Sequence, residues 1–195
     1  ILRFQTLVGW RMRGVMGKSP APLSVLMEAF LISTGLVALA EMGDKTQLLS
    51  LLLAARFRKP VPIIAAILFA TLLNHALAAA VGQWVTAWVS ADVLRWMLGI
   101  SFSLMAGWML IPDQLGDEDE EIARWQRYGV FGMTFILFFI AEIGDKTQIA
   151  TVALAARFDA IVPVLAGTTI GMMIANVPAV LIGDKMAGKL PLKWI

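Results

Sequence analysis

Two short charged runs interrupt otherwise apolar stretches of this sequence. The first run reads Glu41-Met42-Gly43-Asp44-Lys45-Thr46-Gln47. The second run begins 101 residues later (142 − 41) and differs at one position, reading Glu142-Ile143-Gly144-Asp145-Lys146-Thr147-Gln148. Each motif combines two carboxylates with a hydroxyl, an amide and one ammonium group. Oxygen ligands of these kinds suit hard divalent cations such as Mn²⁺, Ca²⁺ and Mg²⁺, so the motifs predict cation chemistry.

The composition indicates the solvent in which these charges must be held. Hydrophobic residues make up 59% of the 195-residue chain, charged residues 15%, and the mean hydropathy is +0.78. Soluble domains have roughly 45–50% apolar and about 25% charged residues. We therefore predict an all-α polytopic membrane protein that contacts the lipid bilayer. The net charge of +2 does not suggest nucleic-acid binding, because Lys and Arg fall mostly between apolar segments.

Five apolar segments are predicted to span the membrane as helices. They cover residues 23–57, 61–89, 92–111, 128–158 and 161–182. Residues 1–22 are predicted to form a basic segment at the membrane surface, and residues 112–127 an acidic loop. If the first span is a continuous helix rising about 1.5 Å per residue, its motif lies near mid-bilayer. An ionisable group there costs roughly 2.5–3.5 kcal/mol, which favours a functional role.

The two motifs belong to a longer internal repeat. Residues 41–65 and 142–166 align without gaps and share 14 of 25 positions. We predict two three-helix membrane repeats, residues 23–111 and 128–195. Because three spans is an odd number, the second repeat should cross the membrane in the inverted direction, as in many secondary transporters. Ile195 aligns with Leu94, where the third helix of the first repeat begins, so we expect a sixth helix to complete the fold.

Inverted repeats can bring the two motifs face to face around one site. Glu and Asp are three residues apart in each motif, so on a continuous helix they share a face. Each Lys follows its Glu by four residues, a spacing suited to an ion pair within the helix, and each Gly allows a local kink. The predicted metal ligands are Glu41, Asp44, Gln47, Glu142, Asp145 and Gln148. The predicted supporting residues are Gly43, Lys45, Thr46, Gly144, Lys146 and Thr147.

Four carboxylates in a low-dielectric site need counter-charge. The two lysines supply part of it, and either protons or a divalent cation must supply the rest, which is the chemistry of an exchanger. The absence of cysteine removes the thiolate ligands that soft metals prefer. His75 has three possible roles: metal ligand, proton relay or packed polar residue. Its equivalent in the second repeat, Asn176, cannot titrate.

The doubled Glu-x-Gly-Asp-Lys-Thr motif resembles the family of Ca²⁺/Mn²⁺–proton exchangers that includes Golgi manganese and calcium transporters and bacterial manganese exporters. The resemblance extends from about residue 24 to 190. It implies six helices in two inverted halves, a cation site made by both motifs, no cofactor, and Mn²⁺ export across the bacterial inner membrane. The residues that carry it are Glu41, Gly43, Asp44, Lys45, Thr46, Glu142, Gly144, Asp145, Lys146 and Thr147.

Basic residues between the predicted spans indicate an orientation. Two of them, Arg95 and Arg157, lie on one side of the membrane. Eight lie on the other side with the acidic loop, which predicts that this loop is cytoplasmic. They are Arg56, Arg58, Lys59, Arg124, Arg127, Lys185, Lys189 and Lys193.

Two other functions remain open from the residues alone. One is an intramembrane metal-dependent enzyme, although the sequence shows neither a pair of His ligands nor a Ser-His arrangement. The other is a non-transporting membrane scaffold whose buried Glu–Lys pairs specify helix packing. The sequence does not indicate an oligomeric state.

Overall fold

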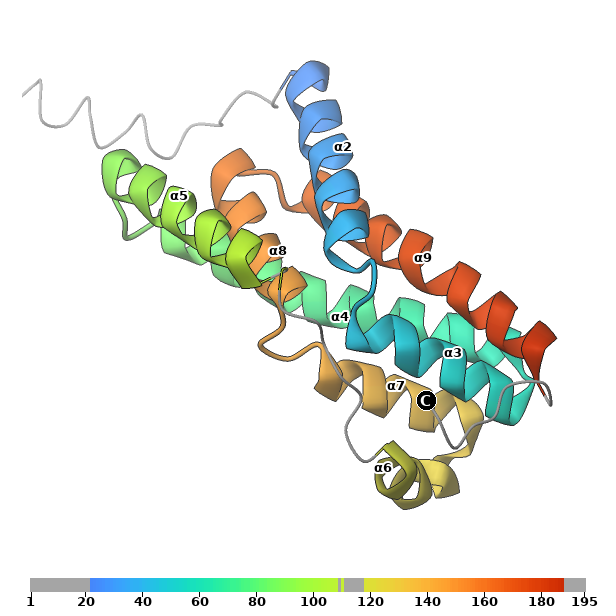
Figure 1. The fold of residues 1–195 in the computed structure, drawn as a ribbon. Coiled ribbons are helices and arrows are strands. Elements are labelled where there is room, and N and C mark those ends of the chain that lie inside the picture. The colour runs from blue at the N-terminus through green and yellow to red at the C-terminus, as the bar shows by residue number, and fades with distance from the viewer. Residues whose placement is uncertain (1–21, 109, 111–117, 188–195) are drawn as a thin grey trace, which may run out of the picture.

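The computed structural model describes residues 22–108, 110 and 118–187, and these residues form helices without any strand (Figure 1). The all-α prediction is therefore confirmed. The predicted surface segment, residues 1–22, lies outside the described residues except for Pro22, and so does Ile195, where the sixth helix was expected to begin. The helices are α2 (Leu23–Ala40), α3 (Lys45–Phe57), α4 (Pro60–Thr86), α5 (Ala91–Trp108), α6 (Glu118–Trp125), η1 (Gln126–Tyr128), α7 (Gly129–Ala141), α8 (Lys146–Phe158) and α9 (Ile161–Met186).

Three of these helices, α2, α4 and α9, are long and apolar enough to cross a membrane. The bent pair formed by Glu120–Ala141 and Lys146–Phe158 makes a fourth span if it is counted as one. Helix α5 lies where we predicted a third span, but it is not among these candidates. It carries Asp92 and Arg95 in its first turns, which lowers its hydropathy. The described residues thus provide up to four spans instead of the five predicted.

The continuous helices predicted over residues 23–57 and 128–158 are wrong, because each is divided at its motif. Helix α2 ends at Ala40 and α3 begins at Lys45, while α7 ends at Ala141 and α8 begins at Lys146. The chain changes direction at each break through a glycine with a positive φ angle, 82° at Gly43 and 79° at Gly144. Only glycine adopts this left-handed conformation without a steric cost. The kink that we expected from these glycines is confirmed. At the second break, the helix direction bends by 70°.

The described part of the acidic connector, residues 118–127, is helical and not the predicted loop. Helix α6 lies within it, and Ile122 on this helix is fully buried in a core cluster with Met133 and Leu137 of α7. Trp125, three residues further on, packs against the same cluster. Apolar residues three apart form one face of a helix, so this short amphipathic segment packs on α7 through that face, and Glu120 and Glu121 are exposed.

Matching contacts relate the two repeats by a two-fold operation. Gly82 on α4 lies against Val152 and Ala155 of α8. Its equivalent, Gly183 on α9, lies against Leu51 and Ala54 of α3, the equivalents of those two residues. When residue i meets residue j of the other copy and j also meets i, the arrangement is that of a two-fold interface. An inverted repeat requires this pattern.

Adding a methyl group at Gly183 should weaken the fold. The Cβ of Gly183→Ala would overlap the carbonyl oxygen of Leu51 and force α9 away from α3. We expect a loss of about 1–3 kcal/mol in stability, measured as a lower melting temperature in detergent. Gly35→Ala is the control, because a Cβ there meets nothing within 4 Å. Equal melting temperatures for the two variants would contradict this packing.

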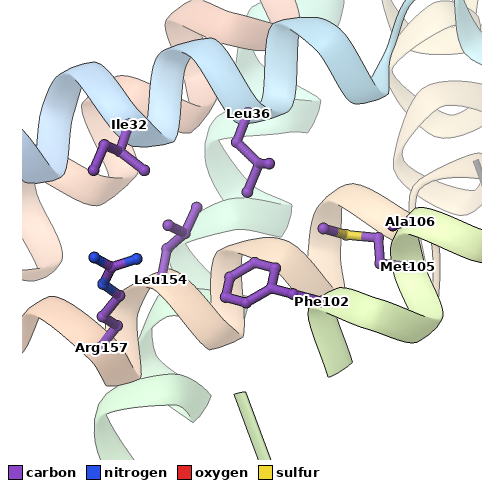
Figure 2. Close-up of a pocket in the computed structure, with 7 residues that line it drawn as sticks. All are labelled: Ile32, Leu36, Phe102, Met105, Ala106, Leu154 and Arg157. Carbon is purple, nitrogen blue, oxygen red and sulfur yellow. The ribbon is translucent and has the colours of Figure 1, made fainter. Parts of the chain in front are cut away.

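An apolar pocket of about 280 Å³ lies between α2, α5 and α8 (Figure 2). One charged residue, Arg157, stands at its edge, 3.9 Å from Glu28. The pocket contains no motif residue, so we do not place the cation site there. Its lining residues are Ile32, Leu36, Phe102, Met105, Ala106, Leu154 and Arg157.

Candidate metal centre

The two helix breaks build one polar centre from four helix ends. Helices α2 and α7 end at the breaks, and α3 and α8 begin there. A helix N-terminus carries partial positive charge and a C-terminus partial negative charge. Discontinuous helices with such ends form the ion sites of many transporters. The backbone therefore supplies dipoles of both signs at the place where the motif side chains lie.

Three motif carboxylates converge in this centre. Glu41, Asp44 and Asp145 are buried and each offers one oxygen, and these oxygens all lie within 4.8 Å of one another. The fourth acid, Glu142, is also buried and close enough to interact electrostatically with the other three. Both repeats contribute, so neither motif forms the cluster alone.

Several carboxylate oxygens in the centre lack a hydrogen-bond donor. Among the described residues, no donor reaches Glu41 Oε1, Glu142 Oε1 or Asp145 Oδ2. A buried carboxylate oxygen without a donor is costly, because it has lost water and gained nothing in return. A bound cation or a proton would satisfy these oxygens, and the donor set is the kind that hard divalent cations prefer.

The lysines pair across the repeats, not within their own helices as we predicted. Lys146 Nζ lies 2.8 Å from Asp44 Oδ1, and Lys45 Nζ lies 3.9 Å from Asp145 Oδ1. The physical reason is the helix break. It removes the continuous turn that would have placed each Lys beside the Glu four residues before it. Each lysine instead offsets the charge of an aspartate in the other motif.

The threonines hold the glutamates. Thr46 Oγ1 donates to Glu41 Oε2 over 2.9 Å, and Thr147 Oγ1 donates to Glu142 Oε2 over 3.0 Å. Asp44 caps α3 by accepting a bond from the Thr46 backbone N–H over 3.3 Å. These bonds hold each glutamate to the threonine on the other side of its break. They use the Oε2 atoms and leave the Oε1 atoms of Glu41 and Glu142 available to a cation or a proton.

Comparison with known proteins places this architecture in a family. The family model described as "Divalent cation/proton antiporter GDT1" matches residues 29–117 and 130–195. This chain belongs to the GDT1 family. A Vibrio cholerae relative named "Putative manganese exporter" is 57% identical over 178 residues, covering 91% of this chain and 87% of the relative. No solved structure matches the chain significantly.

More distant GDT1 relatives align over similar lengths. The rice (Oryza sativa) protein "GDT1-like protein 4" is 29% identical over 200 residues, covering 91% of this chain and 70% of its own. The Saccharomyces cerevisiae protein "Divalent cation/proton antiporter GDT1" is 24% identical over 221 residues, covering 87% of this chain and 78% of the yeast protein. The relatives thus cover both repeats, including both motifs.

The glutamines in this GDT1-family chain have a structural task that the sequence did not reveal. Gln47 Oε1 accepts a bond from the Gly43 N–H over 2.9 Å, and Gln148 Oε1 accepts one from the Gly144 N–H over 2.8 Å. Gln47 also donates to the carbonyl of Ala175 on α9 over 3.1 Å. The two glutamine side-chain oxygens thus stabilise the backbone at the breaks. The role of Gln47 and Gln148 as metal ligands stays a prediction.

His75 lies on α4 and is fully buried. Among the described residues, none forms a hydrogen bond with either ring nitrogen, and its equivalent Asn176 is buried too. His75 does not belong to the carboxylate cluster. Its role as a proton relay stays a prediction.

Sequence reasoning assigned no role to Asn74, which ties α4 to the second break. Its side-chain amide donates to the carbonyl of Phe139 over 3.0 Å, near the end of α7. Phe139 precedes Glu142 by three residues, so this bond helps to position the motif. The available signal was a polar residue within an apolar span.

Removing a threonine hydroxyl should loosen its glutamate. Thr147→Val keeps the size of the side chain but leaves Glu142 Oε2 without its donor. We expect a loss of about 1–3 kcal/mol in stability, seen as a lower melting temperature in detergent. Thr147→Ser restores the hydroxyl and is expected to recover most of the loss. An unchanged melting temperature for Thr147→Val would show that the bond contributes nothing.

Proposed function

We propose that this chain is a secondary transporter that exports a divalent cation in exchange for protons through the site formed by its two motifs. Mn²⁺ is the principal cation and Ca²⁺ the alternative. The protein lies in a bacterial inner membrane with the acidic connector on the cytoplasmic side. It needs no cofactor and is not an enzyme, because the cation is its cargo.

The observation that carries this proposal is the cluster of Glu41, Asp44 and Asp145, whose oxygens lie within 4.8 Å of one another and come from both repeats. Together with Glu142, Lys45 and Lys146, these groups have a formal charge of −2. One divalent cation or two protons would offset that charge. A site that can be neutralised in either way can alternate between the two cargoes, which is what an antiporter requires.

Transport by purified protein in liposomes tests the proposal. An imposed pH gradient is expected to drive Mn²⁺ across the membrane, and the movement should stop when the gradient is collapsed. Competition by Ca²⁺ and Mg²⁺ then ranks the cations. Protein-free liposomes are the control. If no divalent cation moves at any pH gradient, the transport function is wrong.

One observation favours the scaffold as a second candidate. The Lys146–Asp44 pair is short and almost fully buried, as a pair that specifies helix packing would be. A scaffold, however, does not need three carboxylate oxygens within reach of one cation. Metal binding separates the two functions, because a scaffold should show no saturable Mn²⁺ binding that competes with protons.

A further inference from the structure

The two lysine–aspartate pairs are equivalent in sequence but differ in geometry. Lys146 is 4% exposed and lies 2.8 Å from Asp44, which is fully buried. Lys45 is 37% exposed and lies 3.9 Å from Asp145, which is 3% exposed. The centre is therefore closed around Lys146 and more open around Lys45. The two-fold relation between the sequences does not predict this difference.

A pocket of about 190 Å³ lies at the open side. Lys45 and Glu121 are its charged members, contributed by α3 and by α6 of the acidic connector. Ala141, the residue before Glu142, also lines it. The pocket thus lies between the acidic helix and two residues at the helix breaks, Lys45 in the first motif and Ala141 directly before the second. The remaining lining residues are Leu49, Leu137 and Ile140.

We propose that this pocket is the passage through which a divalent cation reaches the carboxylates from the side of α6. This inference rests on the proposed transport function. Glu121 is a positioning residue that attracts the incoming cation, and Lys45 is the barrier that the cation must displace. A positive side chain beside the passage repels a cation, whereas a carboxylate opposite to it offsets that repulsion.

Lys45 can be displaced by a cation because its ion pair with Asp145 is long and partly exposed. Its ammonium group is 3.9 Å from Asp145 and partly exposed, so moving it costs less than moving the buried Lys146. A shift of Lys45 toward Glu121 would free Asp145 for the cation while keeping the lysine beside a carboxylate.

Neutralising Glu121 provides the first test. Glu121→Gln is expected to raise the KM for Mn²⁺ roughly three- to tenfold on the α6 side, with the maximal rate retained. The difference should shrink at high ionic strength. Glu120→Gln is the matched control. It removes the same charge from the adjacent exposed residue, which does not line the pocket, and should leave the KM unchanged.

The outcomes separate this inference from the proposed function. If the unmodified protein moves no divalent cation, the transport function itself fails. If it moves Mn²⁺ and Glu121→Gln has the same KM as Glu120→Gln, the passage is wrong. A fall in maximal rate without a change in KM would also overturn the positioning role of Glu121.

Labelling with a hydrophilic thiol reagent gives a second test that does not depend on transport. The chain has no cysteine, so one introduced thiol reports alone. Ile140→Cys places it in the pocket, and its two-fold equivalent Leu39→Cys is the control, with exposures of 49% and 62% at the native residues. Reagent added on the α6 side should modify Ile140→Cys faster, and Mn²⁺ should slow that reaction. Equal rates for both variants would overturn the passage.

Discussion

Replacing Asp44 by asparagine is expected to reduce proton-driven Mn²⁺ transport to the level of protein-free liposomes. Asp44 supplies one oxygen of the carboxylate cluster, caps α3 and pairs with Lys146. Asparagine is a good N-cap residue and is similar in size, so the helix break should survive. The negative charge does not survive, and the affinity for Mn²⁺ should fall by about 10–100-fold or more.

Two further variants complete this test. Asp145→Asn should also abolish transport, because Asp145 supplies an oxygen to the same cluster. Asp92→Asn on α5, where the side chain is 90% exposed, should transport normally. Isothermal titration with Mn²⁺ shows whether the loss lies in binding. Transport that persists in the Asp44→Asn/Asp145→Asn double variant would refute the site.

Lys146→Gln should destabilise the protein far more than Lys45→Gln. Breaking a buried ion pair leaves an uncompensated charge and costs about 3–5 kcal/mol. Lys146 and Asp44 are 4% and 0% exposed, which places their pair in that class. A partly exposed pair contributes only about 0–1 kcal/mol, and Lys45, at 3.9 Å from Asp145, belongs to that class. Melting temperatures in detergent measure the difference.

A double variant checks the cause of the Lys146 effect. Asp44→Asn/Lys146→Gln removes both charges, so it should be more stable than Lys146→Gln alone. A double-mutant cycle gives the coupling between the two residues. If Lys45→Gln and Lys146→Gln lower the melting temperature equally, the asymmetry between the two pairs has no energetic meaning.

The sequence predicted the membrane class, the repeat and the residues that gather at the centre. These followed from features that one chain displays directly: a high apolar content, an ungapped internal alignment, and charges within apolar runs. The offset of 101 residues between Glu41 and Glu142 also predicted which residues would become two-fold equivalents. Gly82 and Gly183 then proved to occupy equivalent contacts.

The local course of the chain at the motifs could not be predicted in the same way. Apolar residues lie on both sides of each motif, which favoured one continuous helix where Gly43 and Gly144 take positive φ angles. That error placed each lysine beside its own glutamate. Helix α6 was hidden for the opposite reason, because its acidic composition obscured the apolar face on which Ile122 is buried.

The balance of charge in the centre has an electrical consequence. Four carboxylates and two lysines leave a formal charge of −2, and under the proposed exchange this charge is offset by one divalent cation in one direction and by two protons in the other. Such a cycle carries no net current. The membrane potential, which acts on moved charge with about 2.3 kcal/mol per elementary charge per 100 mV, would then perform no work on it. Export would be driven by the proton concentration ratio alone and would continue in a depolarised cell.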